Sequence, residues 1–213
     1  MILWGQQYLE DSNVYFGHGT DNALDEAAWL VSHAVGLAPT FGDAELEQVL
    51  TPAQLAEVKA LLTRRVQERL PAAYLTHEAW FAGHRFYVDE RVLVPRSPMA
   101  ELILDGFEPW VDSTQLKRVL DLCTGSGCIA IATALALPQV MVDATDISPG
   151  ALEVARRNVA DYELAQRVEV IESNLFDALQ GKRYDLIVSN PPYVDAQDMA
   201  ALPEEYRREP SMG

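Results

Sequence analysis

The stretch S-N-P-P-Y-V at residues 189–194 carries groups that could hold a planar nitrogen. Pro191 and Pro192 donate no N–H and fix the backbone dihedral φ, and a residue before proline is held extended, so Asn190 cannot relax into a helix. The Asn190 side-chain oxygen and the Pro191 carbonyl could therefore accept both hydrogens of an –NH2 group, while Tyr193 offers a flat face for stacking. Two prolines after a strand also form ordinary turns, but this combination favours binding of an amide or amino group.

A second candidate is the glycine-rich stretch D-L-C-T-G-S-G-C at residues 121–128. Gly125 and Gly127 stand where an apolar run gives way to a helical one. Glycines there let a ligand approach the backbone closely, and a helix N-terminus favours negative charge. The third residue after Gly127 is Ala130, a permitted variant of the dinucleotide fingerprint. By itself the turn is compatible with a dinucleotide site, a nucleoside site or only a tight turn.

Two further polar positions follow the next strand-like runs. Asp146 ends one such run, and an acid at that place can accept hydrogen bonds from both ribose hydroxyls of a nucleoside. Asn174 and Leu175 follow another run and would lie beside the base. The alternatives are an exposed acid in an acid-rich chain and a loop asparagine before a core leucine. Together with the glycine turn, the spacing favours a nucleoside site.

These residues are placed by an alternation of strand-like and helix-like segments after Lys117. Such alternation with short loops predicts βαβ units in a parallel sheet, whose ligands bind at the carboxyl ends of the strands. The fourth strand, which leads into Asn190, should lie beside the glycine turn. We expect strands over 118–122, 140–146, 167–173 and 184–189, and helices over 128–137 and 148–162.

The N-terminal part has helical periodicity instead. We expect one helix over 20–36, capped by Thr20 or Asp21 and closed by Gly36, and another over 51–71 whose Thr51 begins a capping box.

Residues 72–96 are aromatic and β-branched, with Gly83 at a turn, and predict a linking β-hairpin. Ser97 and Pro98 then begin another helix. The predicted division is a helical domain at 1–71, the hairpin at 72–96 and a sheet domain at 97–213. His77 and His84 fall in the hairpin region, where histidines are more often surface residues than ligands.

The composition limits the class of partner. The formal net charge is −16 and the pI about 4.5, so the surface repels phosphate backbones and suits a basic partner. No apolar run is long enough for a membrane helix, and the start of the chain lacks a signal peptide. Cys123 and Cys128 suggest neither a disulfide framework nor a zinc site, so we expect a cytoplasmic protein with no metal.

The three motifs together, D-L-C-T-G-S-G, Asp146 and N-P-P-Y, resemble S-adenosylmethionine-dependent methyltransferases that modify planar amide or amino nitrogens. The helical start, the hairpin and V-L-V-P-R-S-P resemble the protein-glutamine N5-methyltransferases within that class. The release-factor branch of this family has P-R-P followed by an acidic T-E pair, which is absent here. F-G-H-G-T-D-N-A-L-D-E-A at 16–27 and E-Y-R-R-E-P at 205–210 resemble the other branch, whose substrate is large-subunit ribosomal protein number three.

The resemblance implies a Rossmann-like methyltransferase sheet with a small helical N-terminal domain, S-adenosyl-L-methionine as cofactor, and a basic ribosomal protein as substrate. It implies a direct role in methyl transfer for Asn190, Pro191 and Tyr193, and contact of the same residues with the substrate together with Pro192. Arg96 is a further candidate for substrate contact, with the cap of a contact between domains as the open alternative. The implied cofactor-binding residues are Asp121, Cys123, Thr124, Gly125, Ser126, Gly127, Asp146, Asn174, Leu175 and Asn190.

Three alternatives stay open at this point: glutamine methylation of release factors, N6-methylation of adenine in nucleic acid, and a binding module for ribosome assembly without catalysis. The negative charge and the lack of basic clusters disfavour nucleic acid. A full sheet of this class has about seven strands, so four strands predict a chain shortened at its C-terminus, with the run at 184–189 as an unprotected edge.

Overall fold

The computed structural model describes residues 1–37, 42, 47–192 and 201–210, and the chain forms two compact units. The helical unit comprises Met1–His77 with Ala196–Arg208, and the sheet unit comprises Glu78–Asp195 with Glu209–Gly213. No helix within the described ranges is long and apolar enough to cross a membrane. The division into three domains expected from the sequence stays a prediction.

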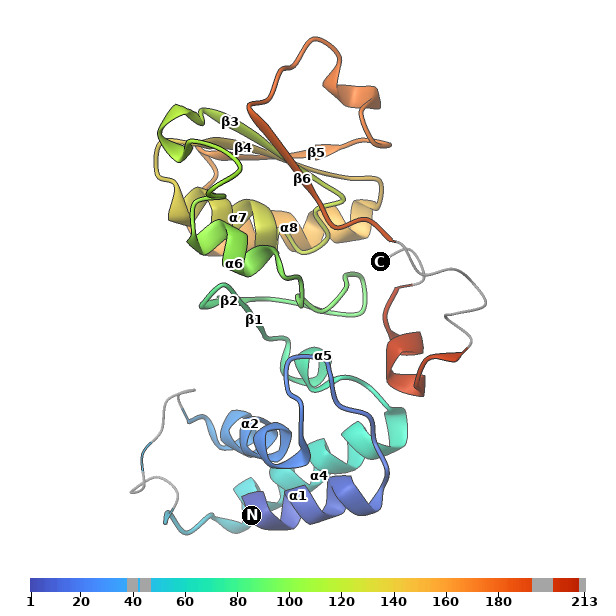
Figure 1. Ribbon diagram of the computed structural model, residues 1–213. Helices are drawn as coiled ribbons and strands as arrows, with labels where there is room; N and C mark the ends of the chain where they lie inside the picture. Colours follow the sequence, from blue (N-terminus) through green and yellow to red (C-terminus); the bar gives the residue numbers. More distant parts are fainter. Residues whose placement is uncertain (38–41, 43–46, 193–200, 211–213) are drawn as a thin grey trace. The chain divides into compact units, whose positions relative to one another are not determined.

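The described residues of the helical unit form four α-helices, and α2 packs against both α1 and α4 (Figure 1). Leu9, Leu30, Val58 and Leu62 are fully buried in its core. Gly5 allows a close approach, because a Cβ atom there would lie 3.1 Å from the Leu62 side chain. The helices are α1 (Ile2–Asp11), α2 (Ala23–Val35), α4 (Pro52–Glu68) and α5 (Ala72–Thr76).

The capping residues expected from the sequence are confirmed at two helix ends, and the expected N-cap of α2 is not. Thr51 and Gln54 form the expected capping box, and Gly36 closes α2 in the left-handed conformation at φ 72°. The N-cap of α2 is Asn22, whose side chain accepts the Asp25 N–H, so the expectation of Thr20 or Asp21 was wrong. The Thr20 hydroxyl is used elsewhere, since it donates to Glu26.

The hairpin is shorter than its aromatic sequence suggested. It consists of β1 (Ala79–Phe81) and β2 (His84–Phe86), joined through Gly83 at φ 78°. Helix α5 occupies the first residues of the stretch expected to be a hairpin, because Ala72–Thr76 are all buried and close a helical turn. The following helix, α6 (Met99–Leu104), has Pro98 as its N-cap, while Ser97 accepts the Met99 N–H with its hydroxyl.

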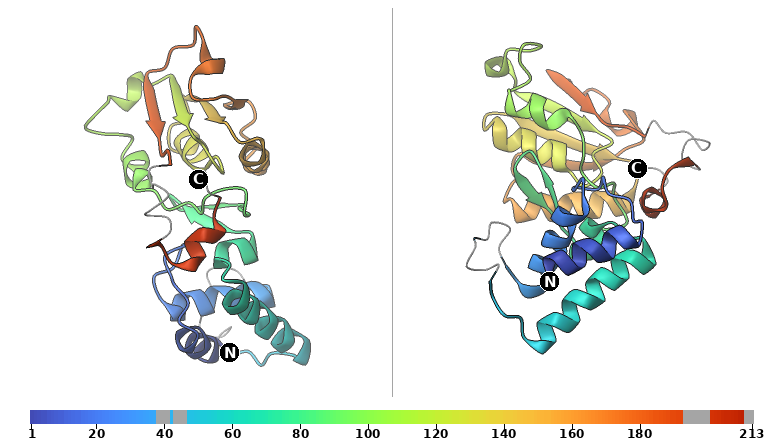
Figure 2. Two further views of the ribbon diagram at one scale, coloured as in Figure 1. Left: turned by 90° about the vertical axis from the view of Figure 1, so that its right-hand side faces the viewer. Right: turned by 60° about the horizontal axis from the view of Figure 1, so that its bottom comes forward.

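The sheet unit contains the expected four-stranded parallel sheet, in the order β5-β4-β3-β6. Helices α7 and α8 lie along one face of it, as Figure 1 and the second view of Figure 2 show. The strands are β3 (Arg118–Leu122), β4 (Met141–Asp146), β5 (Val168–Glu172) and β6 (Leu186–Ser189), and the helices are α7 (Cys128–Ala136) and α8 (Pro149–Asp161). Short 3-10 helices complete the fold: η1 (Ser113–Gln115), η2 (Asp177–Leu179) and η3 (Glu204–Arg208).

Buried Asp143 of β4 links neighbouring parts of the sheet unit. Its carboxylate accepts hydrogen bonds from Arg118, Lys182 and Tyr184. Burial alone would raise the pKa of Asp143, but these three donors outweigh burial and hold the pKa below its ordinary value.

The register brings the ends of three strands to one edge. Leu122 of β3 lies opposite Thr145 of β4 on one side and Ser189 of β6 on the other. The residues that follow these strands therefore begin at the same level, which is the condition for a shared site at the carboxyl edge of a parallel sheet.

Candidate functional site

A cavity of about 680 Å³ lies in the sheet unit, at the carboxyl ends of the strands. Most of the residues expected to form the site line this cavity. Asp121 and Gly127 are not part of its wall, and Tyr193 lies outside the described residues. The expected residues on the wall are Arg96, Cys123, Thr124, Gly125, Ser126, Asp146, Asn174, Leu175, Asn190, Pro191 and Pro192.

The glycine turn is fixed by backbone hydrogen bonds. The Thr124 N–H donates to the Thr145 carbonyl at 2.9 Å, and the Gly127 N–H donates to the Thr124 carbonyl at 2.9 Å. Gly125 is left-handed at φ 55°, and a Cβ atom there would meet no heavy atom within 4 Å. Gly127 has a different reason to be glycine: at φ 80° its missing Cβ would lie 3.3 Å from Ala155. The first glycine thus leaves open space beside the cavity, and the second allows α7 to pack closely on α8.

Asp146 connects the second strand to this turn. Its carboxylate accepts the N–H of Gly125 and the N–H of Ser148, both at 2.9 Å. An ionised carboxylate has about four lone-pair positions, so two backbone bonds leave capacity for further donors. Asp146 can therefore hold the turn and also accept hydrogen bonds from a ligand in the cavity.

Asp121 lies beneath the turn and is completely buried. One carboxylate oxygen accepts the Thr124 hydroxyl and the Ala130 N–H, while the other has no hydrogen-bond partner among the described residues. Burial, helped by the nearby charge of Asp146, raises the pKa of Asp121 to about 7 against the lowering effect of its two donors. The geometry supports an indirect role, in which Asp121 shapes the turn from below.

A hydrogen bond joins β6, the strand before Asn190, to β3, the strand before the glycine turn. The Ser189 hydroxyl donates to the Leu122 carbonyl at 2.8 Å, directly before the turn begins. Asn190 is half-buried, whereas Pro191 and Pro192 are exposed. The tip of β6 is thus held beside the turn while the two prolines reach the cavity wall.

Asn158 of α8 is a positioning residue that the sequence reading missed. Its buried side-chain amide donates to the carbonyls of Ser126 and Tyr87, and its oxygen accepts the Tyr87 N–H. One amide therefore joins the glycine turn to the segment that leaves the hairpin. Asparagine has a low propensity for helix interiors, so its presence inside an expected helix was the feature of the sequence that could have indicated a specific role for Asn158.

Two arginines on the cavity wall are both held by carboxylates. Arg91 pairs with Asp89 at 2.6 Å and with Glu153 at 2.6 Å. Arg96 pairs with Glu209 through both terminal nitrogens, at 2.5 and 2.6 Å. Neither guanidinium is available as an isolated cation for an anionic ligand. The sequence left two roles open for Arg96, substrate contact or the cap of a domain contact, and it did not identify the acid that pairs with this residue.

The two cysteines flank the turn as free thiols. Burial raises the pKa of Cys128 to about 12. Burial and the charge of Asp146 also raise the pKa of Cys123. Both side chains are therefore neutral thiols at physiological pH.

The cavity fits a nucleoside-bearing cofactor. Its volume is in the usual range for small-molecule sites, roughly 300–1,000 Å³. Its wall combines apolar groups, including Ile129, Ile147 and Leu175, with the Asp146 carboxylate. A Cβ atom at Gly125 would meet no heavy atom within 4 Å, so the space beside this glycine is open to a ligand. A side chain at position 125 would occupy that space. These are the features that a ribose and a flat base require.

Comparison with known proteins gives matches over both units. A profile of the Methyltransferase small domain family matches residues 100–204, and a profile of the PrmC N-terminal domain matches residues 1–76. Ribosomal protein uL3 glutamine methyltransferase of Bordetella pertussis is 54% identical over all of this chain, which covers 72% of that protein. The protein of the same name from Neisseria gonorrhoeae is 51% identical over 96% of this chain and 68% of its own length.

Solved structures overlap with a smaller part of the chain. The delta-N METTL16 MTase domain is 25% identical, with a TM-score of 0.44 and coverage of 51% of either chain. The T. thermophilus 16S rRNA N2 G1207 methyltransferase in complex with AdoMet and guanosine is 19% identical, with a TM-score of 0.45, and covers 56% of this chain and 33% of its own.

Proposed function

The chain belongs to the family of ribosomal protein uL3 glutamine methyltransferases, and on this premise we propose that it methylates the side-chain nitrogen N5 of a glutamine in ribosomal protein uL3. The cofactor is S-adenosyl-L-methionine. One observation carries the proposal: Asn190, Pro191 and Pro192 line the same cavity as the glycine turn and Asp146. The residues proposed to bind the amide and those proposed to bind the nucleoside therefore face one cavity.

We assign the amide to Asn190 and Pro191. An amide nitrogen is a poor nucleophile because its lone pair is delocalised into the carbonyl. The Asn190 side-chain oxygen and the Pro191 carbonyl accept its two hydrogens, which favours positive charge on nitrogen and fixes its orientation. When bound, S-adenosylmethionine would supply an electrophilic methyl group on a sulfonium sulfur, and the S–C bond that breaks would leave its electron pair on sulfur, with a neutral thioether, S-adenosylhomocysteine, as the leaving group. Tyr193 and Pro192 are proposed to form the flat surface against which the glutamine amide lies.

No strong base is needed for the proton balance. The newly methylated nitrogen carries a positive charge and is highly acidic, so one proton passes to water. The oxygens of Asn190 and Pro191 need only hold the remaining N–H. This agrees with the wall of the cavity, where the one carboxylate is Asp146 among the described residues.

The cofactor is assigned to the turn of residues 123–127 and to Asp146, with Asn174 and Leu175 beside the base. Asp146 has lone pairs left for ribose hydroxyls after its two backbone bonds. Leu175 is half exposed and lines the cavity, as a side chain that covers a base would. Asp121 contributes from beneath the turn, and Gly127 contributes by letting α7 pack closely on α8.

Paired arginines support a protein substrate over nucleic acid. Arg91 and Arg96 are both neutralised by carboxylates, so the described part of the wall offers no isolated cation for a phosphodiester. The net charge of −16 favours a basic protein, as ribosomal proteins are. Release-factor methylation is disfavoured by the relatives, which are named for uL3. We propose a cytoplasmic reaction, consistent with neutral free thiols.

The test is a methyl-transfer assay with recombinant uL3, a release factor and an adenine-containing oligonucleotide, followed by mass location of the methyl group. We expect methylation of a uL3 glutamine. Asn190→Ala should lower kcat by about 10²–10³-fold, the range for loss of a preorganised polar contact in a transition state. Cofactor affinity, measured by calorimetry, should change by less than about threefold, far below the change in kcat. Methylation confined to another substrate, or normal turnover by Asn190→Ala, would refute the proposal.

A further inference from the structure

Leu175 lines the cavity in an unfavourable backbone conformation. Its φ is 48°, in the left-handed region, where the Cβ atom of an ordinary residue crowds a carbonyl oxygen. The side chain is half exposed, so burial of apolar surface offsets little of this cost. A strained residue persists only where its surroundings hold it, and such residues are found preferentially at binding sites. The groups that hold Leu175 therefore decide the shape of this part of the wall.

The Ser173 hydroxyl holds the backbone of Leu175. It donates to the Leu175 carbonyl at 2.8 Å and accepts the Ala178 N–H at 3.1 Å. Ser173 is buried, so both bonds are shielded from competition with water. One hydroxyl thus closes the loop of residues 173–178 and fixes the direction of the peptide group that follows Leu175.

Ser173 is itself anchored to the sheet. It follows β5, and its N–H donates to the Asp146 carbonyl at 2.9 Å, one step beyond the last paired residues of the two strands, Asp146 and Glu172. Asp146 is also the residue whose carboxylate accepts an N–H of the glycine turn. The Ser173 side chain therefore starts from a backbone position as fixed as the strands themselves, and its hydroxyl transfers this order to Leu175.

The far end of the loop is fixed independently. Leu179 of η2 is buried in a small apolar cluster with residues of β3. The Asp177 N–H donates to the Asn174 carbonyl at 3.1 Å, which turns the chain without a bond to Leu175. Loss of the Ser173 hydroxyl would therefore leave the ends of the loop in place and release its middle, where Leu175 lies.

The side chain that this loop presents suits a flat base. Leu175 and Ile147 both line the cavity, and they are 53% and 54% exposed. Ile147 follows Asp146 at the end of β4, so the two apolar side chains come from the ends of neighbouring strands. Neither side chain can form a hydrogen bond, so each contributes only through the apolar surface that a ligand covers. That contribution depends directly on where the side chain is held.

We propose that Ser173 is a positioning residue for the cofactor, which holds Leu175 in the left-handed conformation so that its side chain packs on the base of S-adenosylmethionine. The inference rests on the proposed placement of that base beside Leu175. Without the hydroxyl, the backbone at Leu175 can relax to a negative φ, and the side chain leaves the wall. The loss falls on cofactor affinity, because Asn190 and Pro191, which are proposed to hold the glutamine amide, follow a different strand.

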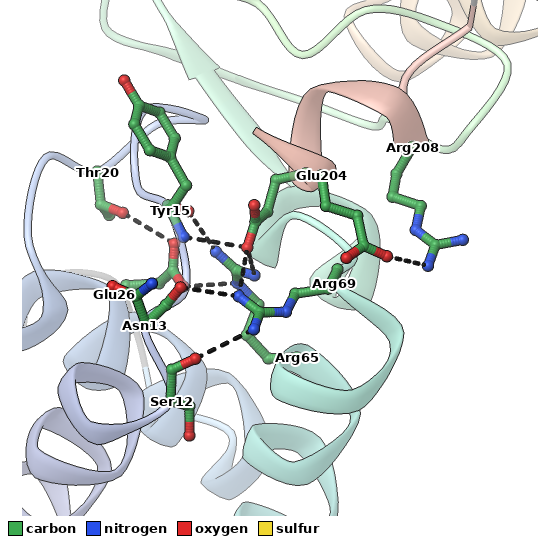
Figure 3. A network of polar contacts seen from close by, with 10 residues as sticks. Ser12, Asn13, Tyr15, Thr20, Glu26, Arg65, Arg69, Glu204 and Arg208 are labelled. Carbon is green, nitrogen blue, oxygen red and sulfur yellow. Dashed lines mark hydrogen bonds and ion pairs between the residues drawn. The ribbon is translucent and has the colours of Figure 1, made fainter. Parts of the chain in front are cut away.

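The test measures the Kd of S-adenosylhomocysteine by calorimetry for the wild type, Ser173→Ala and Ser12→Ala. Ser12→Ala is the matched control, because the Ser12 hydroxyl also donates to a backbone carbonyl, that of Tyr8, at 2.7 Å in the helical unit. The Ser12 carbonyl accepts Arg69 within the network of Figure 3, and the substitution leaves this carbonyl unchanged. We expect Ser173→Ala to raise Kd about fivefold, the factor for loss of one net hydrogen bond, and Ser12→Ala to change it less than about twofold.

Methyl-transfer kinetics separate positioning of the base from a general loss of structure. In Ser173→Ala the KM for S-adenosylmethionine should rise by the same factor of about five, while kcat with uL3 at saturating cofactor stays within about twofold of wild type. Thermal unfolding of the cofactor-free proteins checks that both serine variants are folded at the assay temperature. A fall in kcat as large as the rise in KM would overturn the inference, since it would mean that Ser173 supports the whole site.

A double-mutant cycle tests whether Ser173 acts through Leu175. Leu175→Ala removes the side chain and leaves the backbone groups that bond to the Ser173 hydroxyl, so it should raise Kd about five- to tenfold. In that background Ser173→Ala should change Kd by less than about twofold, because the side chain that it positions is gone. A full fivefold effect of Ser173→Ala in both backgrounds, or wild-type affinity in either single variant, would overturn the inference.

Failure of the inference and failure of the proposed function give different results. Normal binding of S-adenosylhomocysteine without methylation of uL3 would overturn the proposed function, and the Kd ratios would still decide the role of Ser173. A wild type that binds no S-adenosylhomocysteine would overturn the placement of the cofactor and the inference with it.

Discussion

Stability of the cofactor-free protein should decline between pH 4 and pH 8 because of one group, Asp121. This carboxyl is completely buried, and one of its oxygens has no hydrogen-bond partner in the described part of the chain. Burial raises its pKa from 3.8 to about 7, so the folded state holds a proton that the unfolded state has already released. Stability from this group is therefore complete below about pH 4 and is lost as pH rises through about 7.

The size of the effect follows from the change in pKa. A difference of about three pKa units at about 1.36 kcal/mol each corresponds to roughly 4 kcal/mol of unfolding free energy. Asp121→Asn resembles the neutral acid and can still accept the Thr124 hydroxyl and the Ala130 N–H. Its amide –NH2 lacks a partner, however, which costs about 1–3 kcal/mol. At pH 4 the variant should be less stable than the wild type by about 1–3 kcal/mol, and at pH 8 it should be more stable by about 1–3 kcal/mol.

Urea unfolding at several pH values between 4 and 8, followed by fluorescence, measures both curves. Asp161→Asn is the control, because Asp161 is an exposed acid on α8. Its curve should keep the wild-type dependence on pH. Parallel curves for the wild type and Asp121→Asn across this range would refute the reasoning, since they would mean that Asp121 is ionised in the folded state throughout.

Three other changes test the packing around the site and in the helical core. Leu62→Ala should lower the free energy of unfolding by about 2–5 kcal/mol in denaturant titrations, because Leu62 is fully buried; a loss below 1 kcal/mol would contradict the packing. Gly127→Ala should lower the free energy of unfolding, measured by thermal unfolding, by about 1 kcal/mol more than Gly125→Ala. A Cβ atom at position 127 would press on Ala155, whereas a Cβ atom at position 125 would meet no heavy atom within 4 Å. Equal losses of stability would argue against the close contact with Ala155. In Asp143→Asn the free energy of unfolding should fall less steeply than in the wild type as the pH is lowered. The pKa of Asp143 is held below its ordinary value in the folded state, so the stability that this carboxylate contributes is complete above about pH 4 and is lost below it. An unchanged acid transition would show that the donors to Asp143 are not coupled to folding.

The strands of the sheet and the residues at its carboxyl edge could be predicted because they depend on short-range patterns in the sequence. Each strand is a short apolar run that ends at a polar residue, and parallel pairing brings those ends together. Asp146 and Asn190 are examples: their positions after Thr145 and Ser189 determined their place once the strands paired. The glycine turn was equally evident, because Gly125 and Gly127 interrupt an otherwise regular pattern.

Contacts between distant residues could not be predicted in this way. The pair of Arg96 and Glu209 joins residues 113 positions apart, and no local pattern marks which of many acids is the partner. The N-cap of α2 was predicted wrongly for a related reason. Thr20, Asp21 and Asn22 are all favourable N-cap residues. The Thr20 hydroxyl instead donates to Glu26, a contact that the local sequence does not indicate, and Asn22 is the N-cap.

The neutral state of Cys123 and Cys128 has a consequence for the durability of the enzyme. Both thiols line the cavity in which, on the proposed function, an electrophilic methyl group is transferred. A thiolate is a far better nucleophile than a glutamine amide and would compete for that group, with self-alkylation as the result. Because burial raises the pKa of both thiols, to about 12 for Cys128, we expect neither sulfur atom to compete with the glutamine amide for that group.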